Sequence, residues 1–585
     1  MASSICNFCG NMHTTMIGNS SMTSSSHSIG VRPMTVASSE TIEQESVVIR
    51  RSGNYQPPIW KYDYIQNLKK AYNEVVARDQ LKEDVSIMLV KVKAGGDPLL
   101  QLDLIDTLIR LGLAYLFDDQ IKSILNNISC HDDTWKKDDL SSTSLGFRLL
   151  RQYGYEVHAD IFNTFKDENG SFKATLSGDI KGMLHLYETS YLLVEDENIL
   201  EDARRFATKH LKEYLKKENR NLYLSLLINH ALELPLHWRI TRSEARWFID
   251  TYEIKQDMSP LLALAKLDFN LVQSIHQDDL RYSSKWWRST RLGEKLHFVR
   301  DRIMENFLWT IGIFFEPQFG YCRRPLTKII SLITIIDDVY DVYGTLDELH
   351  LFTNAIKRWR IDELEQLPYY MRICYSTLFN TINEIASQVL KEQGICIISY
   401  LKDSWADLCE CYLLEAKWYH NNYIPTLEEY LENAHVSVSV PLTLIQVFFW
   451  TNNQMTEKEL QCLKEQPDII RHSAMIFRLA DDLATSSHEI EMGDVPKSIQ
   501  CFMHETGATE EDARAHIQEL MEQEWKKLNA ACKNSLFSDF FNRTTMNVTR
   551  MAMLMYQNGD HGHASQSKES IDRVLSLLIH PIPVP

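Results

Sequence analysis

Apolar residues recur every three or four positions along most of this chain, which is the spacing of one face of an α-helix. Over residues 62–251 the pattern predicts amphipathic helices of about 12 to 20 residues, of which 99–109 is one example. A boundary is expected near residues 252–260, and the helices after it are more apolar. The pattern therefore predicts an all-α protein with two helical domains, residues 46–255 as a double layer of helices and residues 256–585.

The composition agrees with this prediction. Glycine (21 of 585 residues) and proline (16) are scarce, which favours long helices over turns and strands. The net charge of −18 argues against nucleic acid as a partner, because phosphate binding needs a basic surface. No stretch reaches the roughly 18 apolar residues that a membrane span needs. An acidic chain suits a polyvalent cation instead.

The N-terminal segment differs from the rest of the chain. Residues 1–39 contain no Asp or Glu but ten Ser and four Thr. This acid-poor, Ser-rich composition is typical of plastid transit peptides, and a disordered tail is the alternative. We therefore expect residues 1–45 to be a transit peptide and the mature protein to work in the chloroplast stroma.

Two acidic clusters each lie in or beside an apolar run that is predicted to be a buried helix. In the first, Asp337 and Asp341 are four residues apart, so a helix places them one turn apart on one face. In the second, Asp481, Thr485 and Glu489 repeat the same spacing, so their oxygens form a stripe two turns long. These five residues are the predicted metal ligands.

The chemistry of these five side chains indicates the ion. Buried carboxylates are unfavourable unless a positive charge neutralises them. Oxygen ligands without Cys or His at matching spacing favour Mg²⁺ or Mn²⁺. Other acidic pairs, such as Asp118-Asp119, have no second spaced cluster and are interpreted as solvated helix ends or loops. The two clusters together predict a site for metal ions and a diphosphate, with no organic cofactor.

The two clusters resemble the aspartate-rich motif and the second metal motif, Asn/Asp-Asp-Leu-x-Ser/Thr-x-x-x-Glu, of class I terpene synthases. Arg50-Arg51, followed by eight residues and Trp60, resembles the RRx8W motif of plant monoterpene synthases. Arg300-Asp301-Arg302 resembles the family's RxR motif, and residues 493–500 resemble another family block. The resemblance implies a catalytic C-terminal class I terpenoid synthase α-bundle. The N-terminal domain would be structural, since no DxDD acid motif of class II cyclases occurs.

The resemblance also implies a reaction, the metal-dependent ionisation of geranyl diphosphate to an allylic carbocation. The cation would then be deprotonated, cyclised or quenched by water to a ten-carbon terpene. Three Mg²⁺ or Mn²⁺ ions would bind the diphosphate, held by Asp337, Asp341 and Asp481 together with Thr485 and Glu489. Basic residues would also bind the diphosphate: Arg50, Arg51, Arg300, Arg302, Arg478 and Lys497.

Trp309 matches the family's pocket tryptophan, and an ordinary core tryptophan is the alternative. A cation over an indole ring is stabilised by roughly 0.5 to 2 kcal/mol. On an ideal helix, however, Arg300 and Trp309 are nine residues apart and face opposite ways. Both can face one pocket only if Arg300 and Arg302 lie on a loop before the helix.

A block near the C-terminus resembles the family's YxxGDGHG sequence but departs from it. The histidine position of that block is Gly562 here, with His561 and His563 on either side. Tyr556 and Asp560 carry over as candidate catalytic residues. The residue that accepts the terminal proton stays open.

A helix that begins at the capping box Thr426 to Glu429 is interrupted by Ser437-Val438-Ser439-Val440-Pro441. Proline removes a backbone donor and frees a carbonyl one turn back. A simple kink is one interpretation. The resemblance implies instead a broken helix whose carbonyls face the cavity.

The favoured prediction is a plastid monoterpene synthase, a carbon–oxygen lyase that works as a monomer on a prenyl diphosphate. A sesquiterpene synthase acting on farnesyl diphosphate shares the fold and motifs, but the transit peptide and RRx8W favour the ten-carbon substrate. A chain-elongating prenyltransferase would need paired aspartate-rich motifs. A non-catalytic helical binding protein would leave the arginine motifs unexplained. The product and its stereochemistry stay open, and the expected monomer is not fixed by any residue pattern.

Overall fold

Helices form nearly all of the regular structure in the described residues, where the one β-interaction is an isolated bridge between Lys166 and Phe172. The all-α prediction is therefore confirmed. The computed structural model describes residues 50–53, 55–68, 75–131, 139–218, 220–255, 260–452, 455–491, 495–557 and 567–584, with the side chains of 487–491 left out. Residues 50–585 belong to one unit, and residues 1–45, the predicted transit peptide, lie outside the described part.

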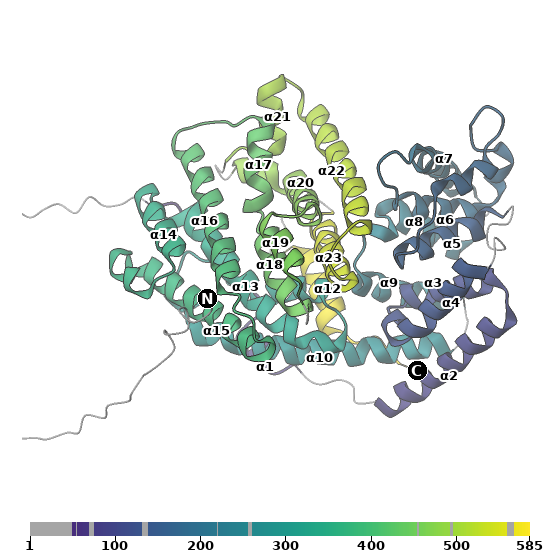
Figure 1. Ribbon diagram of the computed structural model, residues 1–585, viewed down its shortest axis with the longest axis horizontal. Helices are drawn as coiled ribbons and strands as arrows, with labels where there is room; N and C mark the ends of the chain where they lie inside the picture. Colours follow the sequence, from purple (N-terminus) through teal and green to yellow (C-terminus); the bar gives the residue numbers. More distant parts are fainter. Residues whose placement is uncertain are drawn as a thin grey trace, which may run out of the picture. The chain divides into compact units, whose positions relative to one another are not determined.

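The N-terminal helices are coloured purple to blue in Figure 1. Several begin where a short polar side chain accepts a first-turn amide, as Asp97 does from Leu99 at 3.0 Å. α6 packs against both α5 and α7, and α5 packs against α3, in agreement with the predicted double layer. The elements are α1 (Tyr62–Gln66), α2 (Val75–Gly95), α3 (Pro98–Arg110), α4 (Asp118–His131), α5 (Leu140–Gln152), α6 (Ile180–Ser190), α7 (Asn198–Leu215), α8 (Leu222–Glu233), η5 (Leu236–Trp238) and α9 (Thr241–Glu253).

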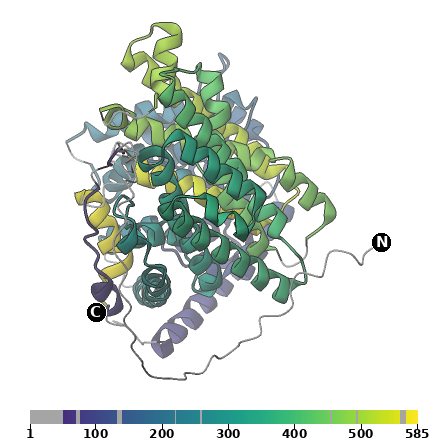
Figure 2. The same cartoon turned by 90° about the vertical axis from the view of Figure 1, so that its left-hand side faces the viewer.

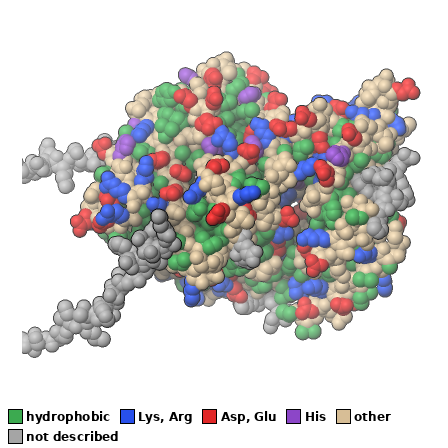
Figure 3. All heavy atoms as spheres, in the orientation of Figure 1, with side chains coloured by type: hydrophobic (Ala, Val, Ile, Leu, Met, Phe, Trp, Pro, Cys, Tyr) green, Lys and Arg blue, Asp and Glu red, His purple; other side chains and the backbone are tan. Residues whose placement is uncertain are grey.

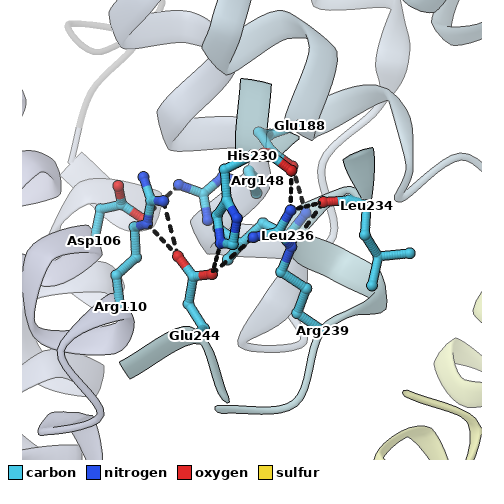
Figure 4. A network of polar contacts seen from close by, with 9 residues as sticks. All are labelled: Asp106, Arg110, Arg148, Glu188, His230, Leu234, Leu236, Arg239 and Glu244. Carbon is cyan, nitrogen blue, oxygen red and sulfur yellow. Dashed lines mark hydrogen bonds and ion pairs between the residues drawn. The ribbon is translucent and has the colours of Figure 1, made fainter. Parts of the chain in front are cut away.

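A network of buried charged side chains joins these helices (Figure 4). Glu244 accepts a hydrogen bond from Arg110 at 2.9 Å and contacts His230 at 2.9 Å and Arg239 at 3.1 Å. Arg239 also donates to the carbonyl oxygen of Leu234 at 2.7 Å. Burial raises the pKa of Glu244, but the surrounding arginines and His230 outweigh it and hold that pKa well below its usual range. The network thereby fixes the chain that leads into η5.

The helix η5 contacts the C-terminal helices directly. The indole of Trp238 stacks on that of Trp525 with ring centroids 5.1 Å apart. His237 contacts Asn529 at 2.9 Å, and Arg550 donates to the carbonyl oxygen of His237 at 2.8 Å. Trp525 and Asn529 belong to α22 and Arg550 to α23, and both helices pack on α20, which carries the second acidic cluster. η5 of the N-terminal group therefore contacts two helices that pack on α20.

The C-terminal helices form a bundle beside this first group, and α10 runs along both groups (Figures 1 and 2). α9 ends and α10 begins on either side of the domain boundary predicted after residue 255, which stays a prediction. The elements are α10 (Pro260–Thr290), α11 (Leu292–Lys295), α12 (Ile303–Ile313), α13 (Gly320–Asp338), η7 (Val339–Tyr343), α14 (Leu346–Arg358), α15 (Tyr369–Gln393), α16 (Ile398–His420), α17 (Leu427–Ser437), α18 (Val440–Thr451), α19 (Glu457–Lys464), α20 (Asp468–Glu491), α21 (Ser498–Thr506), α22 (Glu510–Lys533), α23 (Asp539–Tyr556) and α24 (Lys568–Val574).

The predicted helix break is present between α17 and α18. α17 begins with the predicted capping box, in which Thr426 and Glu429 bond each other's backbone amides. Ser439 then adopts a left-handed conformation with φ of 66°, and Pro441 lies in the first turn of α18. Residues 427–451 are long and apolar enough to cross a membrane, but 78% of their apolar window is buried inside the bundle.

The face shown in Figure 3 carries Lys and Arg side chains interspersed with Asp and Glu. On that face the described residues form no single broad basic region.

Candidate active site

A cavity of about 160 Å³ lies among the C-terminal helices, and it brings together residues that are far apart in the sequence. Arg300, Arg302, Trp309 and Asp337 line it from the segment around α12 and from α13. Arg478, Asp481 and Tyr556 line it from α20 and α23. These seven residues were all predicted from the sequence to belong to one site.

The arginines and the tryptophan face the same cavity because α12 begins late. Its first residue is Ile303, and Arg302 occupies the capping position before it. Arg300 and Arg302 therefore lie on the loop before the helix, while Trp309 lies on the second turn. The sequence predicted that Arg300 and Arg302 can share a pocket with Trp309 only if both arginines lie on a loop before the helix, and the structure places them there.

In the first acidic cluster, Arg300 binds both adjacent aspartates. It forms an ion pair with Asp337 and another with Asp338, in which Nε lies 2.7 Å from Oδ1. The backbone N–H of Arg300 also donates to Asp338 Oδ2 at 2.7 Å. Asp338 is fully buried, and this burial raises its pKa to about 6 against the opposing field of Arg300. Asp338 thus holds the loop, and Asp337 faces the cavity.

The sequence predicted a regular helix through Asp341, and this prediction is wrong. α13 ends at Asp338, and residues 339–343 form a π-helical turn closed by a 2.8 Å hydrogen bond from the amide of Gly344 to the carbonyl oxygen of Val339. The next helix, α14, begins at Leu346 and has Thr345 as its N-terminal capping residue. Asp341 lies on this turn and is not among the residues that line the cavity.

The second acidic cluster repeats the arrangement of the first. Arg478 forms an ion pair with Asp481 and another with Asp482, in which Nε lies 2.8 Å from Oδ1. Asp482 is fully buried and accepts hydrogen bonds from the backbone amide of Ser498 and the hydroxyl of Tyr430, each at 3.1 Å. Burial, with the neighbouring charge of Asp482, raises the pKa of Asp481 above its usual range against the opposing charges of Arg478 and Lys497. Each cluster therefore has one buried anchor and one carboxylate at the cavity.

Thr485 and Glu489 lie on α20, as the spacing predicted. The hydroxyl of Thr485 donates to the carbonyl oxygen of Asp481 at 3.0 Å. The side chain of Glu489 lies outside the described residues. Lys497 is buried at the capping position before α21, and its charge opposes the rise in the pKa of Asp481. Lys497 does not line the cavity.

The donors fit a hard cation. They are carboxylate and hydroxyl oxygens, which Mg²⁺ and Mn²⁺ prefer. The ion pair with Arg300 uses Oδ2 of Asp337, and Asp337 lines the cavity as well. Within the described residues, no group of three His, Cys, Asp or Glu side chains converges closely enough to hold an ion alone.

Trp309, Phe477 and Tyr556 form an aromatic cluster on the cavity wall, and the hydroxyl of Tyr556 donates a hydrogen bond to Asp481 of the second acidic cluster. Trp309 stacks on Phe477 with centroids 5.2 Å apart and an interplanar angle of 20°. Tyr556 lies 6.2 Å from Trp309 and 5.8 Å from Phe477, centroid to centroid. Such ring faces stabilise a nearby positive charge. Asp560, the other residue predicted from the C-terminal block, lies outside the described residues.

The tandem arginines lie beside the cavity but do not line it. Arg50 binds Glu348 through two hydrogen bonds of 2.8 Å and donates to the carbonyl oxygen of Tyr343 at 2.9 Å. Its guanidinium also lies over the rings of Tyr343 and Tyr370, 4.5 Å and 5.1 Å from their centroids. Arg51 is exposed and lies 4.3 Å from the ring centroid of Tyr419. Arg50 is therefore a partly buried residue that pairs with Glu348, and the predicted binding of the diphosphate by Arg50 and Arg51 stays a prediction.

The segment after Arg51 contacts the first cluster. The guanidinium of Arg300 lies 5.1 Å from the ring centroid of Tyr55. Although 37% of Tyr55 is exposed, its hydroxyl bonds to Asp338. The carbonyl oxygen of Gln56 accepts two hydrogen bonds of 3.3 Å from Arg302. The N-terminal segment is thus tied to both arginines of the loop before α12.

Comparison with known families gives two matches, which follow one another along the chain. Residues 59–232 match "Terpene synthase, N-terminal domain", and residues 288–527 match "Terpene synthase family, metal binding domain". The chain belongs to the terpene synthase family.

Relatives of this terpene synthase match over nearly its whole length. It is 56% identical to (-)-alpha-terpineol synthase from Vitis vinifera, over 92% of both chains. It is 54% identical to a chloroplastic myrcene synthase from Quercus ilex, over 94% of this chain and 93% of that one. A limonene synthase structure with 2-fluorolinalyl diphosphate superposes with a TM-score of 0.88 and 42% identity, covering 92% and 100% of the two chains.

A second solved structure shows a metal-bound neighbour of this terpene synthase. It is the isoprene synthase of grey poplar, in complex with three Mg²⁺ ions and dimethylallyl-S-thiolodiphosphate. Its TM-score is 0.82 at 43% identity, covering 90% of this chain and 99% of that one. This terpene synthase is therefore an enzyme of prenyl diphosphates with a metal-binding catalytic domain.

The sequence analysis missed several residues of the site. Asp338 and Asp482 were not distinguished from their neighbours, although the pairing of aspartates in both motifs was a usable signal. Phe477 had no signal beyond its apolar surroundings, and Tyr55 had none beyond its place between the tandem arginines and Trp60. Glu305 lines the cavity one turn before Trp309, and that four-residue spacing could have placed it there.

Proposed function

We propose that this enzyme is a monoterpene synthase that ionises geranyl diphosphate and releases a ten-carbon terpene and diphosphate. The observation that carries the proposal is that two arginine–aspartate clusters and a cluster of aromatic rings line one cavity. The curated relatives that match over nearly the full chain are named as synthases of ten-carbon terpenes, which supports the same substrate. The reaction would be that of a carbon–oxygen lyase.

The residues of the clusters suit the first step. Arg300 and Arg478 present forked N–H donors that match diphosphate oxygens, and Arg302 adds charge from the same loop. Asp338 and Asp482 would keep the first two arginines at the cavity if Asp337 and Asp481 bound a cation. Lys497 would add positive charge near Asp481.

Divalent ions would supply Lewis-acid neutralisation of the leaving diphosphate when they are bound. We propose that Mg²⁺ or Mn²⁺ binds through Asp337, Asp341, Asp481, Thr485 and Glu489. The three ions of the isoprene synthase complex support the same number here. The oxygen donors described above fit this assignment, and no organic cofactor is needed.

The remaining walls suit the second step. The indole of Trp309 and the rings of Phe477 and Tyr556 would face the allylic cation and stabilise it by roughly 0.5 to 2 kcal/mol per close ring. Arg50 is bound to Glu348 of α14 and Gln56 to Arg302 of the loop before α12, and these contacts would help to exclude water from the cation. Residues 46–255 would otherwise be structural.

We also propose that the enzyme works in the plastid stroma as a monomer. Several of the relatives are named chloroplastic, and residues 1–39 lack acidic side chains. A fluorescent protein fused after residue 49 should accumulate in plastids. The same fusion lacking residues 1–45 should stay in the cytosol, and equal distribution of the two would contradict the assignment.

The substrate assignment is tested by product chromatography. The full chain with Mg²⁺ should convert geranyl diphosphate to ten-carbon products faster than it converts farnesyl diphosphate to fifteen-carbon products. Faster turnover of farnesyl diphosphate would favour a sesquiterpene synthase. Absence of product with both substrates would contradict an enzymatic role.

A further inference from the structure

Helix α12 presents a carboxyl group to the cavity one turn before Trp309. Glu305 and Trp309 are four residues apart on α12, and both line the cavity. Along α12, Glu305 lies between Arg302, which precedes the first residue of the helix, and Trp309. The side chain of Glu305 is partly exposed.

Three carboxyl groups line this cavity, and Glu305 differs from the other two. Asp337 is in an ion pair with Arg300, and Asp481 is in one with Arg478. Within the described part of the chain, Glu305 has neither an ion pair nor a hydrogen bond from another side chain. Arg302, the cation nearest in sequence, instead donates to the carbonyl oxygens of Gln56 and Asp301 at 3.3 Å and 3.1 Å.

The carboxyl group of Glu305 accepts a hydrogen bond from its own backbone amide and lies near the charge of Arg302, but it forms no ion pair with any described residue. Ionised, it would be stabilised by a positive charge brought into direct contact with it. A carbocation produced beside Trp309 would supply that charge, and only during turnover. Burial raises the pKa of Glu305 to about 7, so the group can take up a proton near neutral pH and release it again.

We propose that Glu305 accepts the proton that is released when the carbocation is quenched. The inference rests on the proposed function and adds a catalytic residue to it. In the alkene-forming route, the C–H bond beside the cationic carbon breaks, and its electron pair becomes the new π bond. The proton passes to a carboxylate oxygen of Glu305, so a cation and an anion become a neutral alkene and a neutral carboxylic acid.

The alcohol-forming route uses the same acceptor. Water adds to the cationic carbon through an oxygen lone pair, and the proton that the new oxonium group loses passes to Glu305. In both routes the carboxyl group returns its proton to solvent when the product leaves. Glu305 therefore affects which product forms after ionisation, whereas the arginine–aspartate clusters affect whether ionisation occurs.

The experiment compares product composition and diphosphate release in the full chain with Mg²⁺ and geranyl diphosphate. Glu305→Gln keeps the shape of the side chain but cannot accept the proton. We expect diphosphate release to fall by less than about tenfold, because ionisation uses other residues. The share of the main wild-type product should fall at least twofold, and Glu305→Asp should restore part of it.

Glu316→Gln is the matched control. Glu316 follows α12, is 5% exposed and has a pKa raised by burial, but it does not line the cavity. Its variant should give the wild-type product composition. If Glu316→Gln shifts the composition as much as Glu305→Gln does, loss of any buried carboxyl explains the result and the proposal is overturned.

An unchanged product composition in Glu305→Gln also overturns the proposal, whatever the rate, because a residue that only supports Arg302 or the fold slows all products equally. If circular dichroism shows that Glu305→Gln does not fold, the decision passes to Glu305→Asp, which withdraws the carboxyl by one methylene. Its composition must then differ from wild type. Failure of the wild-type chain to convert geranyl diphosphate would contradict the proposed function instead.

Discussion

Replacing Glu348 should reproduce the effect of replacing Arg50. The two side chains share a pair of hydrogen bonds of 2.8 Å and are 17% and 22% exposed. Burial raises the pKa of Glu348, but the bonds from Arg50 and the amide of Thr345 outweigh it and lower that pKa to about 2. We expect Glu348→Gln and Arg50→Ala each to loosen the N-terminal segment, because each removes the same contact.

The pKa of Glu348 and the exposure of the pair limit the free energy of the contact between Arg50 and Glu348. A fall in the pKa of Glu348 from an ordinary 4.5 to about 2 would correspond to roughly 3 kcal/mol if all of it came from the folded contact. Partial exposure reduces this value, and a half-buried bidentate pair supports a coupling of about 1 to 2 kcal/mol between Arg50 and Glu348. The two variants should therefore be strongly non-additive.

The assay is product chromatography of the full chain with geranyl diphosphate and with linalyl diphosphate. Each single variant and the double variant should lose the same share of cyclic product, or gain the same share of water-quenched alcohol, from geranyl diphosphate. Turnover of linalyl diphosphate should be retained. Glu410→Gln, which breaks an exposed pair with Lys357 on the surface, should leave the products unchanged.

One result would refute this reasoning. If Arg50→Ala changes the products while Glu348→Gln leaves them as in the wild type, Arg50 acts on the diphosphate directly. The contact with Glu348 would then be incidental to its role. Fully additive changes in the double variant would lead to the same conclusion.

Further predictions concern the second cluster, the domain contact and pH. Asp482→Asn should lower kcat/KM for geranyl diphosphate by about 10- to 100-fold in steady-state kinetics, because Arg478 loses its buried acceptor; an unchanged value would contradict the anchoring role. Trp525→Ala should destabilise the protein by about 3 to 5 kcal/mol in denaturant unfolding, since its indole is buried against Trp238, and a loss below 1 kcal/mol would contradict the packing. The low pKa of Glu348 contributes stability that is complete above its unfolded pKa of about 4.5 and is lost as pH falls toward about 2, so Glu348→Gln should flatten the acid limb of the stability profile; an unaltered limb would contradict the linkage.

Much of the fold and part of the site could be predicted from the sequence, because both depend on local spacing. The four-residue repeat of Asp481 and Thr485 requires only a regular helix, and α20 provides it. The loop position of Arg300 followed from helix geometry once Trp309 was assigned to the same pocket. Pro441 marked the break between α17 and α18 because proline cannot donate a backbone hydrogen bond.

The rest depends on contacts that no local pattern contains. Arg50 and Glu348 are 298 residues apart, and neither is unusual in its own segment. Periodicity cannot decide which of two adjacent aspartates is buried, so the anchoring role of Asp338 emerged only from its bonds to Arg300. The π-helical turn that carries Asp341 depends on how the chain is closed at the start of the next helix.

The measurement that most directly tests the central claim is the release of diphosphate from geranyl diphosphate as Mg²⁺ is added to the metal-depleted full chain. Release should be absent in excess chelator and should rise to a plateau with Mg²⁺. Asp337→Ala should nearly abolish it while circular dichroism stays that of the wild type. Full release in chelator, or in folded Asp337→Ala, would contradict ionisation by metal ions held at the two acidic clusters.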